Sequence, residues 1–285
     1  MHKRNVNEFR MEVGSAVIGI ICPNKEYAES FSAYFGVTNS KKEPDITLIL
    51  NLIYHEEDIT IPDSLFTTKT VADDTINIAN GTVLGKIGSD PGQIQLSVKI
   101  GLTHTEVTRV FEQLLYQSFY SACMIKSYDS LLIHSSGVIY HNDGYIFTGP
   151  SGSGKSTIAE LSRNYHVIND EICLIDFNSG NIMLHGTPYN GTFKHKKSGS
   201  AQLKAIFLIK HGAAHSISEI ERSKSVPMLA KEIVPPVPLQ EEFKSKIFIR
   251  MLDMAERICQ SVPVYRLEFL PDRGFWAEID RFFHY

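Results

Sequence analysis

The chain has 285 residues, and its 28 Lys and Arg against 32 Asp and Glu lack the basic excess typical of nucleic-acid binders. Apolar residues make up 43% and charged residues 21%, which excludes a wholly disordered chain. No apolar run approaches the roughly 18 residues of a membrane span, and the four cysteines form no CxxC pair. We therefore expect a cytoplasmic protein that binds neither nucleic acid nor membrane.

The first hundred residues have the pattern of a β-rich α+β domain. Apolar and β-branched runs predict its strands at residues 13–22, 46–54, 75–78, 82–87 and 94–98. A short helix is predicted over residues 26–35. The pair Asn80-Gly81 predicts a hairpin turn because both residue types tolerate positive φ.

The pattern changes after residue 100. Thr103 and Glu106 fit a capping box, and apolar residues then recur at helical spacing, so we predict a helix over residues 103–126. This change places the domain boundary near residue 100. Residues 1–100 are expected to form an accessory or substrate-recognition domain, and residues 101–285 a second domain with the functional site.

The second domain alternates short apolar runs with amphipathic segments. Predicted strands lie at residues 131–134, 136–140, 145–148, 167–168, 173–177, 204–209 and 264–269. Predicted helices lie at residues 157–163, 225–231, 240–261 and 275–282. Residues 141–144 predict a turn with an Asp-Gly hairpin signal. Together these elements indicate an α/β core.

Residues 149–156 match the phosphate-loop pattern G-x-x-x-x-G-K-[ST] at every fixed position. Glycines in this loop let backbone N–H groups surround phosphate oxygens, Lys155 supplies a positive charge, and the Ser156 hydroxyl is a ligand for Mg²⁺. The loop follows an apolar strand and begins a helix, as this motif requires. We therefore predict binding of ATP and Mg²⁺, with nucleotide contacts from Gly149, Ser151, Gly152, Ser153, Gly154, Lys155, Ser156 and Thr157.

Two polar positions flank this loop in the sequence. The acidic pair Asp170-Glu171 follows the loop helix directly, 14 residues after Ser156, whereas the large Walker-type class has its Mg²⁺-binding Asp on a later strand. His134 lies 15 residues before Gly149 on a strand that can fold back beside the loop. From the residues alone, the acidic pair also fits a solvated turn, and His134 also fits a buried core residue.

This arrangement resembles the catalytic domain of bacterial HPr kinase/phosphorylase. The shared features are a His-x-x-Gly-Val strand, a hairpin, a phosphate loop and an acidic pair after the loop helix. Residues 186–191 and 262–276 resemble the smaller HPr-kinase-related proteins. The resemblance covers roughly residues 130–285. It implies an α/β phosphate-loop core of the type that HPr kinase shares with phosphoenolpyruvate carboxykinase.

The resemblance also implies roles for individual residues. Asp170 corresponds to the carboxylate that takes the proton from the substrate hydroxyl, and Glu171 to a second acid beside the metal or the catalytic Lys155. Ser156 and Glu171 are thus the predicted metal ligands, and His134 lies near the transferred phosphate. The chain departs from the family in its Glu at position 171, in the two serines after His134, and in its first hundred residues.

These features predict an ATP- and Mg²⁺-dependent kinase that phosphorylates a serine of a peptide or small protein. Several related proteins accompany clusters for ribosomal peptides such as lasso peptides, which favours a precursor peptide as substrate. The alternatives are a kinase/phosphorylase of an HPr-type carrier protein, a small-metabolite kinase, and a nucleotide-binding regulator without catalysis. Association with a second copy of the chain is a further open expectation.

Two other polar features of the sequence have a structural interpretation. The basic run at residues 194–197 is expected to be a surface loop, with a phosphate- or peptide-binding lid as the alternative. Histidines 104, 166, 185, 211 and 215 lack metal-site spacing and are expected to be structural.

Overall fold

The computed structural model describes most of the chain, and its contacts divide the chain into two compact units. The described residues are 7–22, 25–35, 40–55, 67–71, 75–80, 83–87, 93–99, 112, 115–116, 119–120, 129–177, 180–189, 191–234 and 241–284. One unit comprises residues 1–128 and 236–246, and the other residues 129–235 and 247–285. The predicted boundary between residues 100 and 101 lies outside the described residues and stays a prediction.

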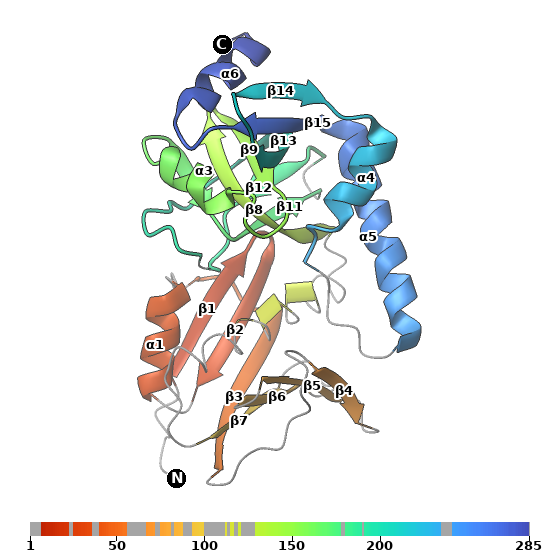
Figure 1. Cartoon of the computed structure of the whole chain (residues 1–285). Helices are drawn as coiled ribbons and strands as arrows, with labels where there is room; N and C mark the ends of the chain where they lie inside the picture. Colours follow the sequence, from red (N-terminus) through yellow and green to blue (C-terminus); the bar gives the residue numbers. More distant parts are fainter. Residues whose placement is uncertain are drawn as a thin grey trace. The chain divides into compact units, whose positions relative to one another are not determined.

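The described part of the first unit contains a seven-stranded sheet in the order β1-β2-β3-β7-β6-β5-β4 (Figure 1). Its strands are β1 (Asn7–Val13), β2 (Ala16–Cys22), β3 (Ile46–His55), β4 (Thr67–Val71), β5 (Thr75–Asn80), β6 (Val83–Ile87) and β7 (Gln93–Lys99). Parallel neighbours need a crossover, and helix α1 (Lys25–Phe35) supplies it between β2 and β3. The buried side chains of α1 pack beside β1 and β2.

The N-terminal hairpin differs from the sequence prediction. We predicted one apolar run over residues 13–22, whereas the structure has two antiparallel strands that turn at Gly14, whose φ is 60°. In β1, Phe9, Met11 and Val13 are buried, while alternate residues are polar, so the period-two pattern of a strand was present. The antiparallel pairing of β5 with β6 confirms the predicted hairpin, whereas Gly81 of its predicted turn lies outside the described residues.

The second unit contains an eight-stranded sheet among its described residues, in the order β10-β8-β11-β12-β13-β15-β14, with β9 between β8 and β13. Its strands are β8 (Ser130–Tyr140), β9 (Asp143–Thr148), β10 (His166–Asn169), β11 (Ile172–Asp176), β12 (Met183–His185), β13 (Ser200–His211), β14 (Ser216–Glu219) and β15 (Val264–Phe269). β9, β13 and β15 run parallel, and β8 is antiparallel to β9, β10 and β11. The mixed α/β prediction is therefore confirmed.

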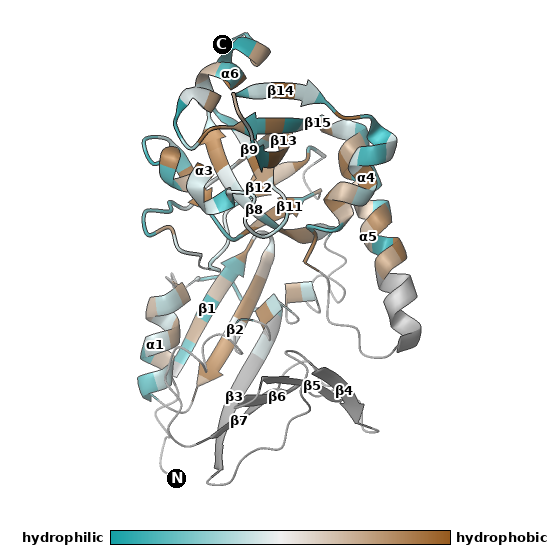
Figure 2. Ribbon diagram, viewed as in Figure 1, coloured by the Kyte–Doolittle hydropathy of each residue, from teal (hydrophilic) through white to brown (hydrophobic). Residues whose placement is uncertain are grey.

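Helices cover both faces of this sheet (Figure 1). The helices are α3 (Lys155–Leu161), α4 (Arg222–Ala230), α5 (Glu241–Ser261) and α6 (Gly274–Phe283). Ile146 and Ile206 pack in the cluster that includes residues of α4 and α5, and Phe147 and Phe207 pack in the cluster that includes residues of α3 and α6. Because both faces are buried, the central strands carry consecutive apolar residues instead of alternating ones, as Tyr145-Ile146-Phe147 in β9 shows; β9 is largely brown in Figure 2.

Several predicted boundaries changed. The two strands predicted at 131–134 and 136–140 form one strand, β8, and β12 and β14 were not predicted. The turn between β8 and β9 uses His141 and Asn142, with φ of 49° and 68°, whereas Asp143 and Gly144 already belong to β9.

The predicted helix at 103–126 lies mostly outside the described residues. Within it, residues 112, 115–116 and 119–120 are helical. Among the described residues, no helix is long and apolar enough to cross a membrane.

Candidate functional site

The β8–β9 hairpin brings His134 beside the start of the phosphate-loop motif. Ser135 pairs with Thr148, the last residue of β9, and the Thr148 hydroxyl donates a 2.5 Å hydrogen bond to the carbonyl of His134. The motif begins at the next residue, Gly149. A separation of 15 residues in sequence therefore becomes direct proximity in the sheet, as the sequence predicted.

Three glycines give the motif loop its shape. Gly149, Gly152 and Gly154 have φ of 154°, 80° and 102°, a region that residues with a Cβ atom rarely adopt. Gly154 is also tightly packed, because an added Cβ atom would lie 2.6 Å from the Phe269 ring. The Ser153 N–H donates to the Pro150 carbonyl at 3.0 Å, which closes the loop.

Lys155 begins α3 and points back into the loop. Its Nζ donates to the carbonyls of Gly149 at 2.6 Å and Pro150 at 3.3 Å. The Ser136 hydroxyl on β8 donates to the Lys155 carbonyl at 2.6 Å, which fixes the start of the helix against the sheet. The cation is thus positioned at the mouth of the loop.

A cavity of about 560 Å³ lies beside this loop. Its lining residues are His134, Ser151, Gly152, Gly154, Lys155, Ser156, Thr157, Glu171, His211 and Glu232. Eight of these were predicted as site residues; the remaining two, His211 and Glu232, were not. Of the other predicted residues, Gly149 and Ser153 belong to the loop without lining the cavity, and Asp170 also does not line it.

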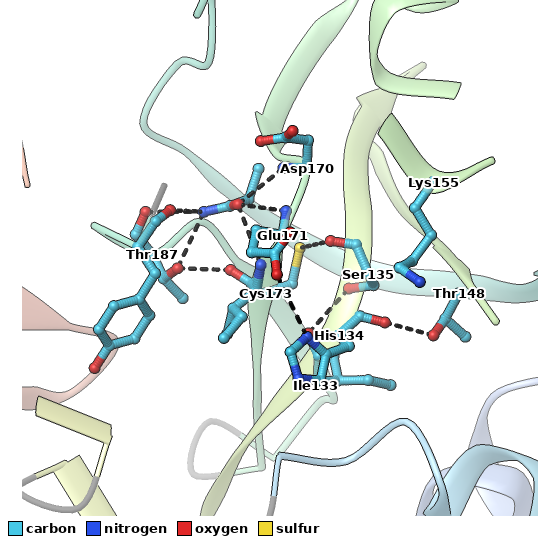
Figure 3. Close-up of polar contacts among 12 residues, drawn as sticks. Ile133, His134, Ser135, Thr148, Lys155, Asp170, Glu171, Cys173 and Thr187 are labelled. Carbon is cyan, nitrogen blue, oxygen red and sulfur yellow. Dashed lines mark hydrogen bonds and ion pairs between the residues drawn. The ribbon is translucent and has the colours of Figure 1, made fainter. Parts of the chain in front are cut away.

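Asp170 is fully buried and turned away from the cavity. Its Oδ2 accepts hydrogen bonds from the N–H groups of Thr192 at 2.8 Å and Phe193 at 2.9 Å, and from the Thr192 hydroxyl at 3.3 Å. An added Cβ atom on Gly191 would lie 2.5 Å from both carboxylate oxygens. Figure 3 shows the Asp170 carboxylate pointing away from Lys155. Asp170 therefore holds residues 191–193 in this arrangement.

Asn169 shapes the turn that separates the two acids. Its Oδ1 accepts from the N–H groups of Asp170, Glu171 and Ile172, and its Nδ2 donates to Thr187 and to the Tyr189 carbonyl. A buried amide with this many partners fixes the backbone and sends consecutive side chains in different directions. Asn169 was not among the site residues predicted from the sequence.

Glu171 and His134 face each other in the cavity (Figure 3), with Oε1 3.8 Å from Nδ1. Burial raises the pKa of Glu171, and the charge of Asp170 raises it further, whereas Lys155 lowers it. Burial also lowers the pKa of His134, with a further lowering from Lys155. Both directions oppose a full ion pair between the two side chains.

Glu232 enters the cavity from a distant part of the sequence. The residues after α4 pair with β8, since His134 N–H donates to the Glu232 carbonyl at 2.8 Å and Val234 N–H to the Leu132 carbonyl at 2.9 Å. Burial raises the pKa of Glu232, and Lys155 and Lys231 lower it. The sequence carries no motif around this residue, so only the chain path identifies it.

The basic run at 194–197 divides into two kinds of residue. Lys196 Nζ donates to the carbonyls of Thr187, Pro188 and Tyr189 at 3.2, 3.2 and 2.9 Å. Lys194, His195 and Lys197 are exposed. One lysine therefore holds the loop together, and the others form its surface, which agrees with the surface-loop prediction.

Comparison with known proteins gives one family match. A family model described as SynChlorMet cassette protein ScmC matches residues 103–284. Among solved structures, the Hpr(Ser) kinase/phosphatase from Coxiella burnetii is similar with a TM-score of 0.29 and 9% identity, over 54% of this chain and 88% of that chain. No curated protein matches the chain.

Proposed function

The chain belongs to the family of SynChlorMet cassette proteins ScmC, and we propose that it transfers the γ-phosphoryl group of ATP to a hydroxyl group. One observation carries this proposal: the phosphate-loop motif, its Lys155, an acid and a histidine line the same cavity. Phosphoryl transfer needs mainly positioning and charge neutralisation, which a cation beside a carboxylate and a backbone cradle supply.

The loop fits the phosphates of a nucleotide. Its three positive-φ glycines carry no Cβ atom to crowd the neighbouring backbone N–H groups. A Cβ atom added to Gly152 would meet nothing within 4 Å, so this part of the loop is open. Lys155 Nζ can exchange its two carbonyl acceptors for phosphate oxygens. A polyphosphate bound in the loop would thus replace the two internal hydrogen bonds of Lys155.

The donor set also fits Mg²⁺, with Ser156 and Glu171 as the proposed ligands in the cavity. No group of three or more His, Cys, Asp or Glu suited to a metal occurs among the described residues. Mg²⁺ commonly takes few protein oxygens and completes its shell with phosphate and water. When bound, the metal neutralises phosphate charge.

The proposed proton acceptor depends on which acid faces the substrate. The sequence resemblance predicts Asp170, but its carboxylate is held by Thr192 and Phe193. Glu171 lines the cavity, so in this arrangement we assign it the orientation of the acceptor hydroxyl and receipt of its proton late in the transfer. Asp170 takes that role only if residues 191–193 release it.

The proposed acceptor is a serine of a peptide or small protein, as the resemblance to HPr-kinase-related proteins implies. The test uses purified protein, Mg²⁺ and ATP labelled on its γ-phosphate. Acceptors are a pool of single-serine peptides, the same pool with alanine for serine, and an HPr-type carrier protein. Label on the serine pool alone supports the proposal. Label on the carrier alone supports the carrier-kinase alternative, and nucleotide binding without transfer to either kind of acceptor refutes a kinase of peptides or small proteins.

A further inference from the structure

We propose that His211 forms the surface on which the base of the bound nucleotide stacks. The nucleoside then occupies the β13 side of the cavity, and the transferred phosphoryl group occupies the β8 side. This inference rests on the proposed function, because it assumes a nucleoside triphosphate in the phosphate loop. It adds a nucleobase subsite, which the loop motif alone does not define.

The sheet gives the cavity two distinct sides. Thr148 at the end of β9 pairs with Ser135 of β8 on one side and with Leu208 of β13 on the other. The motif loop leaves the sheet between these neighbours. β9, β13 and β15 are parallel and end at one edge, and ligands of α/β sheets bind outside the carboxyl ends of such strands.

The charged groups lie on the β8 side. His134 belongs to β8, Glu171 lies in the turn before β11, and the backbone of Glu232 pairs with β8. Carboxylates and a cation suit the reacting phosphoryl group and its acceptor, and they offer little to an uncharged heteroaromatic ring. The base is therefore better accommodated on the opposite side, at the end of β13.

His211 provides a flat ring at that place. It is the last residue of β13, is exposed, and lines the cavity. Its ring packs on that of Phe269, with centroids 5.2 Å apart and an angle of 30° between the planes. Phe269 is fully buried, and the two residues are register partners in adjacent parallel strands. One face of the imidazole is thus supported by the core.

The same ring is adjacent to the loop that would hold the phosphates. A Cβ atom added to Gly154 would lie 3.2 Å from His211 Cε1 and 2.6 Å from Phe269 Cζ. Gly154 therefore allows the loop to approach the aromatic pair closely. A base joined through ribose to phosphates in this loop would lie within the same cavity. Aromatic rings bind nucleobases by stacking, and this contact does not depend on which base is present.

The test compares ATP with inorganic tripolyphosphate, which has no base, by calorimetric titration in the presence of Mg²⁺. The proteins are the wild type, His211→Ala, His211→Phe, Lys155→Ala, and His284→Ala, a control at an exposed histidine outside the cavity. Thermal unfolding of each protein without ligand establishes that it is folded.

We expect His211→Ala to weaken ATP binding roughly 5- to 100-fold, the range that one stacked base provides, and to leave tripolyphosphate binding unchanged. His211→Phe keeps the aromatic face and should retain ATP binding, and His284→Ala should match the wild type. Equal weakening of both ligands by His211→Ala means a phosphate contact and overturns the proposal. Unchanged ATP binding, or failure of His211→Phe to retain it, also overturns it.

Failure of the proposed function has a different signature. In that case the wild type binds neither ligand, or Lys155→Ala binds both as well as the wild type does. Either result refutes the base subsite together with the phosphate site. Loss of tripolyphosphate binding in Lys155→Ala, with no effect of His211→Ala on ATP, refutes the base subsite alone.

Discussion

Lys155 Nζ donates a 2.6 Å hydrogen bond to the carbonyl oxygen of Gly149, so the motif lysine closes its own loop. The cation therefore ties the first residue of the loop to the first residue of α3. The same hydrogen bond therefore links the fold of the loop to the side chain proposed to meet the phosphates.

Lys155→Ala should abolish thermal stabilisation by Mg-ATP, because the variant lacks the charge that meets the phosphates. The measurement is the unfolding temperature with and without Mg-ATP. Lys224→Ala, at an exposed lysine of α4, is the matched control and should keep the full shift. An unchanged shift in Lys155→Ala would contradict the phosphate site.

Glu171→Gln should lose turnover by about 100-fold or more while retaining ATP binding in the absence of Mg²⁺, since Gln keeps the size of the side chain but cannot accept a proton. Turnover with a serine peptide and Mg-ATP, and titration with metal-free ATP, measure the two effects separately. Turnover near that of the wild type would exclude Glu171 as the proton acceptor and return that role to Asp170.

Asp170→Ala should lower the free energy of unfolding by about 2–4 kcal/mol, because the two backbone N–H groups that donate hydrogen bonds to the Asp170 carboxylate would lose their acceptor. Asp170→Asn keeps one acceptor oxygen and should cost less. Chemical denaturation gives both values. The resemblance further predicts that Asp170→Asn binds nucleotide but loses turnover; full turnover in a folded Asp170→Asn protein would limit Asp170 to holding residues 191–193.

Two glycines of the loop form a matched pair for a steric test. Gly152→Ala imposes only an unfavourable φ, which costs about 1–2 kcal/mol, because no atom lies within 4 Å of the added Cβ. Gly154→Ala adds a clash with Phe269 and should cost a further ~1–3 kcal/mol. Chemical denaturation measures the free energy of unfolding of both variants. Equal values would mean that the loop is not packed against Phe269.

Glu232 should make stability depend on pH. Its pKa is raised in the folded state by burial, so the folded protein binds this proton more tightly than the unfolded chain. The resulting stability is present below the ordinary Glu pKa and is lost as pH rises through the raised value. Glu232→Gln, which cannot ionise, should therefore have a higher unfolding temperature than the wild type at pH 7.

That difference should shrink as the pH falls below about 4, because Glu232 of the wild type then becomes protonated in the unfolded as well as in the folded state. Unfolding temperatures over this range measure it, with Glu160→Gln at an exposed position of α3 as the comparison. A difference that stays constant over the range would show that Glu232 is not the titrating group.

Sequence patterns predicted the elements that depend on local chemistry. The phosphate-loop motif placed a strand before Gly149 and a helix at Lys155, and the structure has both. Asn80-Gly81 predicted the β5–β6 hairpin because tolerance of positive φ is an intrinsic property of these two residue types. The Asp143-Gly144 signal misplaced its turn by two residues, since His141 and Asn142 adopt the positive φ values instead.

Local sequence patterns did not predict the directions in which the Asp170 and Glu171 side chains point. Asp170 and Glu171 are adjacent in sequence, yet one is buried beneath residues 191–193 and the other lines the cavity. Asn169 and the packing of a segment some 20 residues further along the chain determine which of the two acids is buried and which lines the cavity. No periodicity in the sequence encodes that contact.

The sequence by itself determined that this chain carries a phosphate-loop motif, an α/β core and polar residues flanking the loop, because backbone propensity and motif spacing are local properties. The tertiary structure alone decided that Glu232 and His211 join the cavity and that Asp170 does not line it. Those outcomes depend on strand pairing and burial between distant segments, which arise only when the chain folds.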